Sequence, residues 1–281
     1  MLQKAKNKLR LQKMMSWGHD FPFGFIGIPE KSRLEAVRDF GFDAVMLHWQ
    51  EENGLDPCRR FDLVAKTGLQ VHTVHFPQER MADMWREGDA GDRLTEEIIA
   101  ALREISERKI SHMVVHTTRR LETPEPNETG LKRFARAAEA AERCGVDLAV
   151  ENTRFLRYNR YLFDRIDSPR LAFCYDCGHN NCFTPKEDAL ELFGDRLVTT
   201  HLHDNHGIRD EHMLIGEGSV DLERVFRRLV ERGVKEYNLE SRYTPIPGEE
   251  PWTLEEYLEK AIGRLKAYIA HAQNDSYAGK A

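Results

Sequence analysis

The sequence predicts an α/β protein folded as a single (β/α)₈ barrel. Short β-rich runs alternate with longer helical runs, and eight such units in 281 residues give about 35 residues per unit, the size of a βαβ repeat. No Ser-, Gly- or Pro-rich linker interrupts the alternation. This pattern implies parallel strands covered by helices, and closure into a barrel leaves no exposed sheet edge. An open doubly wound sheet is disfavoured, because GFIGIPEKS near the first expected strand lacks the GxGxxG spacing of a phosphate-binding turn.

Each strand is expected where apolar, β-branched and aromatic residues run together, because parallel strands are buried on both faces. In chain order, we expect strands at residues 23–28, 44–49, 69–76, 112–118, 146–153, 171–176, 197–204 and 236–241. Each helix is expected where apolar residues recur at helical spacing. These helices are expected at residues 31–39, 56–66, 93–108, 130–144, around 161, 186–193, 222–232 and 254–271.

The ends of the chain differ in composition from the barrel. The first fifteen residues, MLQKAKNKLRLQKMM, hold five basic and no acidic side chains, and they lack the continuous apolar region of a secretory signal. We therefore expect a basic N-terminal arm at residues 1–20, the catalytic barrel at 21–272 and a C-terminal tail at 273–281. If the protein is a homo-oligomer, the arm and the helix at 254–271 are the segments that we expect at the interface.

Composition and net charge limit the cellular locations and the classes of partner that we expect. The chain has 41 Lys and Arg against 47 Asp and Glu, a net charge of −6, which disfavours a nucleic-acid partner. No apolar run approaches the roughly 18 residues that a membrane span needs, so no membrane partner is expected. The five cysteines are an odd number in a chain too large to need disulfides, which predicts a reducing, cytoplasmic location.

Acidic and imidazole side chains recur at the points where the expected strands end. In a (β/α)₈ barrel these points converge on one mouth, and buried charges there cost several kcal/mol unless they are paired or bind a cation. Singly, each residue has an ordinary explanation, such as a helix cap for Glu151 or a turn for Asp176. Jointly they predict a divalent-metal site built from Glu151, Asp176, His201 and Glu240. The strand-end residues are His48, His75, His116, Glu151, Asp176 with His179, His201 with His203 and Asp204, and Glu240.

Two other residue patterns are less typical of a metal site. Cys174, Cys177 and Cys182 have spacings similar to those of a zinc knuckle, but no second CxxC pair exists, and buried thiols explain them better. A lone histidine on a strand, such as His72, is more often a hydrogen-bonded core or surface residue than a ligand.

The chain resembles the xylose isomerase-like TIM-barrel superfamily, which includes sugar and sugar phosphate isomerases and epimerases as well as the endonuclease IV group that acts on abasic DNA. The motifs ENT, YDxGH and HLxDN followed by DxHxxIGEG carry the resemblance. The matching segments are VHFP, VVHT, LAVENT, CYDCGH, HLHDNHGIRDEHMLIGEG and NLES, in this order between residues 74 and 241.

The isomerase and epimerase branch implies one Mn²⁺, Co²⁺, Mg²⁺ or Zn²⁺ ion held by Glu151, Asp176, His201 and Glu240. It also implies a small sugar or sugar phosphate as substrate. Glu151 and Glu240 would be the catalytic pair, moving a proton between neighbouring carbons through an enediolate. His179 would then hydrogen-bond a substrate hydroxyl.

The endonuclease branch implies three Zn²⁺ ions and hydrolysis of a phosphodiester. Its nine ligands also have matches here: His75, His116, Glu151, Asp176, His179, His201, Asp210, His212 and Glu240. The acidic net charge favours the sugar enzyme, and so do the HFPQERM and HWQEENG loops, which lack the polar and aromatic signature of the endonuclease's DNA-penetrating loops. The other five residues, His75, His116, His179, Asp210 and His212, are then expected as additional metal or substrate ligands.

Substrate contacts outside the metal ligands are expected from the loops. Trp49 and Phe76 would offer an apolar wall to a sugar ring, and Arg209 would contact its polar groups. The arginines at 119, 120, 154 and 157 would bind a phosphate or carboxylate, with surface solvation as the ordinary alternative.

Overall fold

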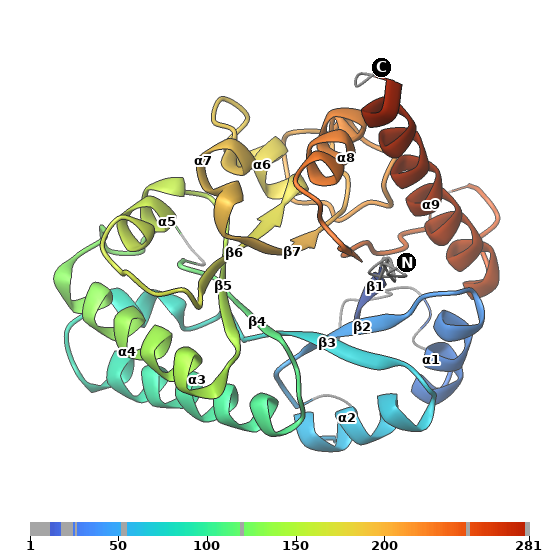
Figure 1. Cartoon of the computed structure of the whole chain (residues 1–281). Helices are drawn as coiled ribbons and strands as arrows, with labels where there is room; N and C mark the ends of the chain where they lie inside the picture. The colour runs from blue at the N-terminus through green and yellow to red at the C-terminus, as the bar shows by residue number, and fades with distance from the viewer. Residues whose placement is uncertain are drawn as a thin grey trace, which may run out of the picture.

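Eight parallel strands form a barrel whose outside is covered by helices (Figure 1). The computed structural model describes residues 12–17, 25, 27–51, 55–118, 121–245 and 248–278. The strands run in the order β7-β6-β5-β4-β3-β2-β1-β8, and a parallel bridge between Leu202 and Leu239 joins β7 to β8. The predicted single (β/α)₈ TIM barrel is confirmed. The strands are β1 (Gln12–Trp17), β2 (Ala44–His48), β3 (Gln70–His75), β4 (His112–Val115), β5 (Asp147–Glu151), β6 (Leu171–Asp176), β7 (Leu197–His201) and β8 (Glu236–Leu239).

Most helices begin at a side chain that caps them. Asp56 accepts a hydrogen bond from the Arg59 amide at the start of α2, and Asn127 accepts one from Gly130 at the start of α4. Between them the helices bury apolar stripes against the strands. They are α1 (Glu30–Asp39), α2 (Pro57–Lys66), α3 (Asp89–Glu107), α4 (Glu128–Cys144), α5 (Leu156–Phe163), α6 (Cys177–Phe183), α7 (Ala189–Phe193), α8 (Leu222–Glu231) and α9 (Leu254–Ala278), with 3₁₀ helices η1 (Met81–Trp85) and η2 (Gly194–Arg196).

The strand predicted at 23–28 is wrong at residues 25, 27 and 28, which lie outside any strand, while residues 23, 24 and 26 lie outside the described residues. The first strand is β1, which lies within the residues assigned to the basic arm and pairs with β2 and β8 through Met14 and Met15. Lys13 made this segment resemble a solvated arm, but its Nζ donates a hydrogen bond to Asp43 at 2.6 Å, so the charge is satisfied at the barrel end. Phe25 instead lies after the strand and stacks on Tyr243. Residues 1–11 of the predicted arm lie outside the described residues.

Two helices also differ from expectation. α6 follows directly from β6, because the Asp176 side chain caps it by accepting from the His179 amide at 2.6 Å. α9 continues to Ala278, into residues assigned to the tail, since no Gly or Pro interrupts the chain between Gly263 and Gly279.

The barrel interior is layered along the strands. Val114, Ala149 and Cys174, from β4, β5 and β6, form a small buried cluster apart from the larger core between strands and helices. Because side chains alternate faces along a strand, the residues two positions before and after these also face the interior. Polar residues occupy those positions at both ends of the barrel.

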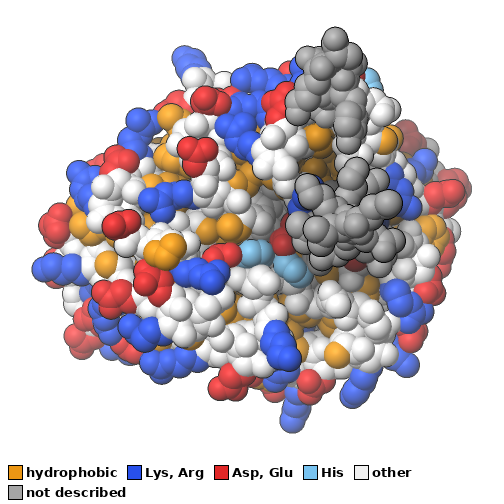
Figure 2. Space-filling model, in the orientation of Figure 1, with side chains coloured by type: hydrophobic (Ala, Val, Ile, Leu, Met, Phe, Trp, Pro, Cys, Tyr) orange, Lys and Arg blue, Asp and Glu red, His pale blue; other side chains and the backbone are white. Residues whose placement is uncertain are grey.

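On the outside, basic and acidic side chains are mixed over the face shown in Figure 2, where histidine side chains also reach the surface near the centre. In the part of the chain that is described, no helix combines the length and apolar character that crossing a bilayer requires.

Candidate metal centre

Nine acidic and imidazole side chains converge at the C-terminal ends of the strands, and they form three adjoining groups. The first group joins β3, β4 and β5. His75 Nε2 and His116 Nε2 lie 3.3 and 3.0 Å from Glu151 Oε2 and 3.2 Å from each other. A hydrogen bond between His75 Nδ1 and the Phe76 carbonyl, at 2.8 Å, orients the His75 ring.

The second group contains the four predicted metal ligands. His201 Nδ1 lies 3.1 Å from Glu240 Oε2, 3.3 Å from Glu151 Oε2 and 3.8 Å from Asp176 Oδ2. Asn152 holds Asp176 from behind: its Oδ1 accepts from the Asp176 amide and its Nδ2 donates to the Asp176 carbonyl, both at 2.8 Å. His201 thus lies beside the carboxylates of the other three predicted ligands.

The third group contains His179, Asp210 and His212. Asp210 Oδ2 lies 3.2 Å from His179 Nε2 and 3.1 Å from His212 Nε2. His179 also lies 2.9 Å from Glu151 through its Nδ1, so this group adjoins the other two. His212 has a φ of 51°, a strained conformation that non-glycine residues adopt mainly where function or packing requires it.

Asp204 fixes the loop that carries the third group. Its side chain accepts hydrogen bonds from the amides of Gly216 and Val220, each at 3.0 Å, and its backbone pairs with Met213. The IGEG motif therefore closes the loop onto the end of β7, which places Asp210 and His212 over the strand ends.

Burial and neighbouring charged groups shift the pKa values of residues in this centre in opposite directions. Glu151 and Asp176 are fully buried, and Glu240 is nearly so. Burial raises the pKa of Glu151, but His116 and His201 outweigh it and hold the pKa well below 4.5. Burial lowers the pKa of His201, but Cys174, Glu240 and Glu151 raise it well above 6.5. A proton on His201 thus offsets part of the carboxylate charge, and a divalent cation that binds at this imidazole must displace it.

The donor set fits a divalent cation. Glu151 Oε1, His201 Nδ1 and Asp210 Oδ1 are buried, and none has a hydrogen-bond partner within the described part of the chain. Buried polar atoms of this kind cost free energy unless they are paired or bound to an ion. Carboxylate oxygens and imidazole nitrogens are suitable ligands for Zn²⁺, Mn²⁺ or Co²⁺.

A cavity of about 370 Å³ opens directly above these groups. His48, Phe76, Glu79, Arg154, Phe183 and Arg242 line it together with the ligand groups. Arg154 stacks on Phe183, with its guanidinium carbon 3.9 Å from the ring centre. The volume suits a small polar molecule with a few contacts of defined geometry.

Several predicted substrate contacts lie elsewhere. Trp49 packs against Phe61 and lines a neighbouring crevice, because the chain turns away after β2. Arg209 is largely exposed and borders a second cavity beside Tyr243. Arg157 pairs with Glu125, and residues 119 and 120 lie outside the described residues.

His203 is a residue of this site that the sequence analysis did not assign a role. Its Nε2 lies 3.1 Å from Asp176 Oδ1, and its ring stacks on His212. Gly178 leaves room for that ring, since a Cβ there would lie 1.9 Å from it. The spacing of His201 and His203 in HLHD could have indicated this role, because residues two apart in a strand face the same side.

The cysteines are poorer metal ligands than these carboxylates and imidazoles, because they are not thiolates. All five are free. Burial raises the pKa of Cys174 and of Cys182 to about 12, which keeps them as neutral thiols near neutral pH.

Comparison with known proteins gives a family and a set of similar structures. The model of the xylose isomerase-like TIM barrel family matches residues 34–268. The uncharacterized protein y4fM of Sinorhizobium fredii is 27% identical, over 86% of this chain and 90% of that protein. Fructoselysine 3-epimerase of Shigella flexneri is 25% identical over 49% of this chain and 52% of the epimerase. A solved structure of an L-ribulose 3-epimerase superposes with a TM-score of 0.76 at 17% identity, covering 97% of this chain and 99% of the other.

Proposed function

The chain belongs to the xylose isomerase-like TIM barrel family, and on that premise we propose that it is a divalent-metal-dependent isomerase or epimerase of a small sugar or sugar phosphate. Similarity to a fructoselysine 3-epimerase and to an L-ribulose 3-epimerase supports a sugar epimerase or isomerase. The single observation that carries the proposal is the pairing of Glu151 and Glu240 around His201, beneath a cavity of sugar size.

Glu151, Asp176, His201 and Glu240 would hold one Mn²⁺, Co²⁺, Mg²⁺ or Zn²⁺ ion. Bound there, the ion would polarise a substrate carbonyl and make the neighbouring C–H more acidic. The remaining work falls to this chain's own side chains.

Glu151 and Glu240 would take a proton from one carbon and return one to its neighbour, through an enediolate. The two carboxyl groups need different protonation states for this exchange, and their surroundings differ. Glu151 faces four imidazoles, from His75, His116, His179 and His201, whereas the Glu240 carboxylate pairs with His201.

Substrate orientation would come from the cavity walls. His179, which lines the cavity, would hydrogen-bond a substrate hydroxyl, and Arg154 and Arg242 would bind a phosphate or another anionic group at the rim. Phe76 would cover an apolar face of the substrate.

Deuterium exchange tests the reaction class. The protein is loaded with Mn²⁺ or Co²⁺ and incubated in D₂O with a panel of free and phosphorylated ketoses. We expect deuterium at the carbon next to the carbonyl of at least one ketose. Glu240→Gln should abolish exchange without loss of helical circular dichroism, while Glu255→Gln, on the exposed face of α9, should retain it. Exchange that survives in Glu240→Gln would contradict the assigned role, and a loaded protein inert toward every ketose would count against the reaction class.

The assembly of all nine donors supports a second candidate, an endonuclease IV-like phosphodiesterase that acts on abasic DNA. His75 with His116 and Glu151, and Asp210 with His179 and His212, form groups that would hold two further Zn²⁺ ions. Three zinc ions per chain at the C-terminal end, together with cleavage of a duplex containing one abasic site, would favour this candidate. One ion there and no cleavage would favour the sugar enzyme.

A further inference from the structure

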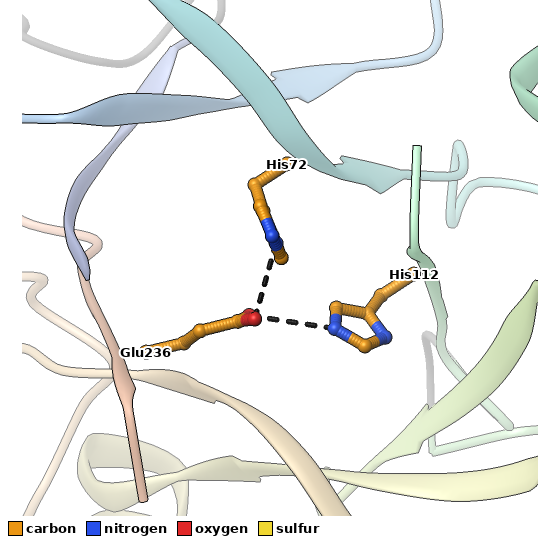
Figure 3. A group of neighbouring side chains, drawn as sticks. All are labelled: His72, His112 and Glu236. Atoms are coloured by element: carbon orange, nitrogen blue, oxygen red, sulfur yellow. Dashed lines mark ion pairs between the residues drawn. The ribbon is translucent and has the colours of Figure 1, made fainter. Parts of the chain in front are cut away.

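A second cluster of two histidines and a glutamate lies at the opposite end of the same barrel. His72 belongs to β3, while His112 and Glu236 are the first residues of β4 and β8. Figure 3 shows their side chains pointing toward one another from three strands. The strand order makes β3 and β4 neighbours and places β1 and β2 between β3 and β8, so Glu236 reaches across the barrel to the two histidines.

The donor atoms lie close enough together to share one metal ion. Glu236 Oε1 lies 3.2 Å from His72 Nδ1, and Glu236 Oε2 lies 3.4 Å from His112 Nε2. Ligands bound to Zn²⁺ at roughly 2.0–2.1 Å in a tetrahedron lie about 3.3 Å apart. One donor atom from each of the three residues falls within 4.8 Å of the other two. Two histidines and a carboxylate are a common set for a divalent transition metal.

The cluster has the outer partner that metal-binding histidines usually have. Asp147, the first residue of β5, places Oδ2 2.9 Å from His112 Nδ1. Arg170 donates to the other oxygen of Asp147 at 2.8 Å and so fixes the carboxylate. Once a cation displaces the Nε2 proton, Asp147 would hold the remaining proton on Nδ1 and leave Nε2 facing Glu236, as in carboxylate–histidine–zinc arrangements.

The donor atoms make ion-pair contacts within the cluster, but two of them make no hydrogen bond of good geometry. His72 Nδ1 and Glu236 Oε2 are buried and lack a hydrogen-bond partner in the described portion of the molecule. Burial raises the pKa of Glu236, but His112 and His72 lower it to about 2, so the carboxylate is ionised. Burial lowers the pKa of His112, but Asp147 and Glu236 raise it to about 9. The potential that holds this proton also attracts a cation.

A β-bulge directs His72 into the cluster. Val45 and Met46 are consecutive in β2, but they pair with Val71 and Thr73, so His72 is an extra residue in β3. In a regular strand, residues three apart face opposite sides, yet His72 and His75 both reach clusters inside the barrel. Bulges commonly redirect a side chain in this way.

We propose that His72, His112 and Glu236 bind a structural divalent cation, Zn²⁺ by the chemistry of its donors, at the N-terminal end of the barrel. The site is separate from the catalytic centre and does not depend on the proposed reaction. Its side chains are 10–19% exposed, which leaves a fourth position open to water. The ion would tie β8 to β3 and β4, and its role would be stability, as is usual for residues at this end of the fold.

Counting bound zinc tests the site. The full-length protein and its variants are dialysed against micromolar Zn²⁺, and the metal per chain is measured with fold checked by circular dichroism. We expect Glu236→Gln and His72→Asn each to bind one ion fewer than the wild type. The matched control is His271→Asn, because His271 also lies beside a carboxylate, Asp275, but on the exposed surface of α9. The control should bind as many ions as the wild type.

A second measurement on the unaltered protein guards against variants that fail to fold. Crystals soaked in Zn²⁺ should give an anomalous peak between His72, His112 and Glu236. Equal zinc counts in folded variants and wild type would overturn the proposal. So would an anomalous map with metal at the C-terminal centre and none between these three residues.

Discussion

The two ends of the barrel use the same strands in different ways. β3, β4, β5 and β8 each carry a polar side chain at both ends, pairing His72 with His75, His112 with His116, Asp147 with Glu151, and Glu236 with Glu240. At the C-terminal end, α6 and the 205–220 loop add donors, and a cavity opens above them. At the N-terminal end, the strands alone supply the cluster. The comparison shows that strands can place ligands at either end, whereas loops and a cavity are what make one end suited to chemistry.

An apolar layer separates the two ends. Val114 and Ala149 lie midway along β4 and β5, and Met46 contacts both His201 and Asn238 through its sulfur. Four residues of strand correspond to about 13 Å, so neither cluster contacts the other directly. Variants at one end should therefore leave the other end nearly unchanged.

The largest effect is expected from Glu151→Gln. Glu151 contacts all three C-terminal groups and is a proposed proton carrier, so its loss should reduce deuterium exchange by about 10²- to 10⁴-fold. Zinc binding at the C-terminal end should weaken as well, while the N-terminal ion is retained. Rates and zinc content measured on one preparation check this, and loss of both ions together would show that the ends are coupled.

A smaller effect is expected from Asp147→Asn, which keeps the shape beside His112 but removes the charge. Changes to such outer partners typically lower metal affinity by about 10- to 100-fold. Competition with a chromophoric chelator should reveal this weakening for the N-terminal ion alone. Unchanged affinity would mean that Asp147 does not orient His112, and slower deuterium exchange would contradict the independence of the two ends.

The smallest effect is expected from Gly178→Ala. The new methyl group must displace the His203 ring, at a cost of about 1–3 kcal/mol in the free energy of unfolding. Because His203 contacts Asp176, metal should bind more weakly at the C-terminal end and normally at the N-terminal end. Urea unfolding and zinc titration measure the two changes, and wild-type values for both would show that His203 moves freely.

The sequence was sufficient to predict the barrel and those C-terminal donors that come directly after a recognisable apolar strand, whereas Asp210 and His212 lie on a loop and were expected only from the family resemblance. It was insufficient for β1. Lys13 gave this strand the composition of a basic arm, because the Asp43 carboxylate that pairs with it lies 30 residues away in the sequence. It also left His72 as an isolated histidine. The starts of β3, β4 and β8 meet only once the strand register is known, and no local pattern marks the extra residue at position 72.

The bulge in β3 has a consequence for how the chain can change. Because the residues on either side of His72 keep consecutive partners in β2, removal of this one codon would leave a regular strand with His75 still opposite His48. Insertion or deletion of one residue in β3 would therefore create or remove the proposed metal site at the N-terminal end of the barrel. The residues at the C-terminal end would keep their register.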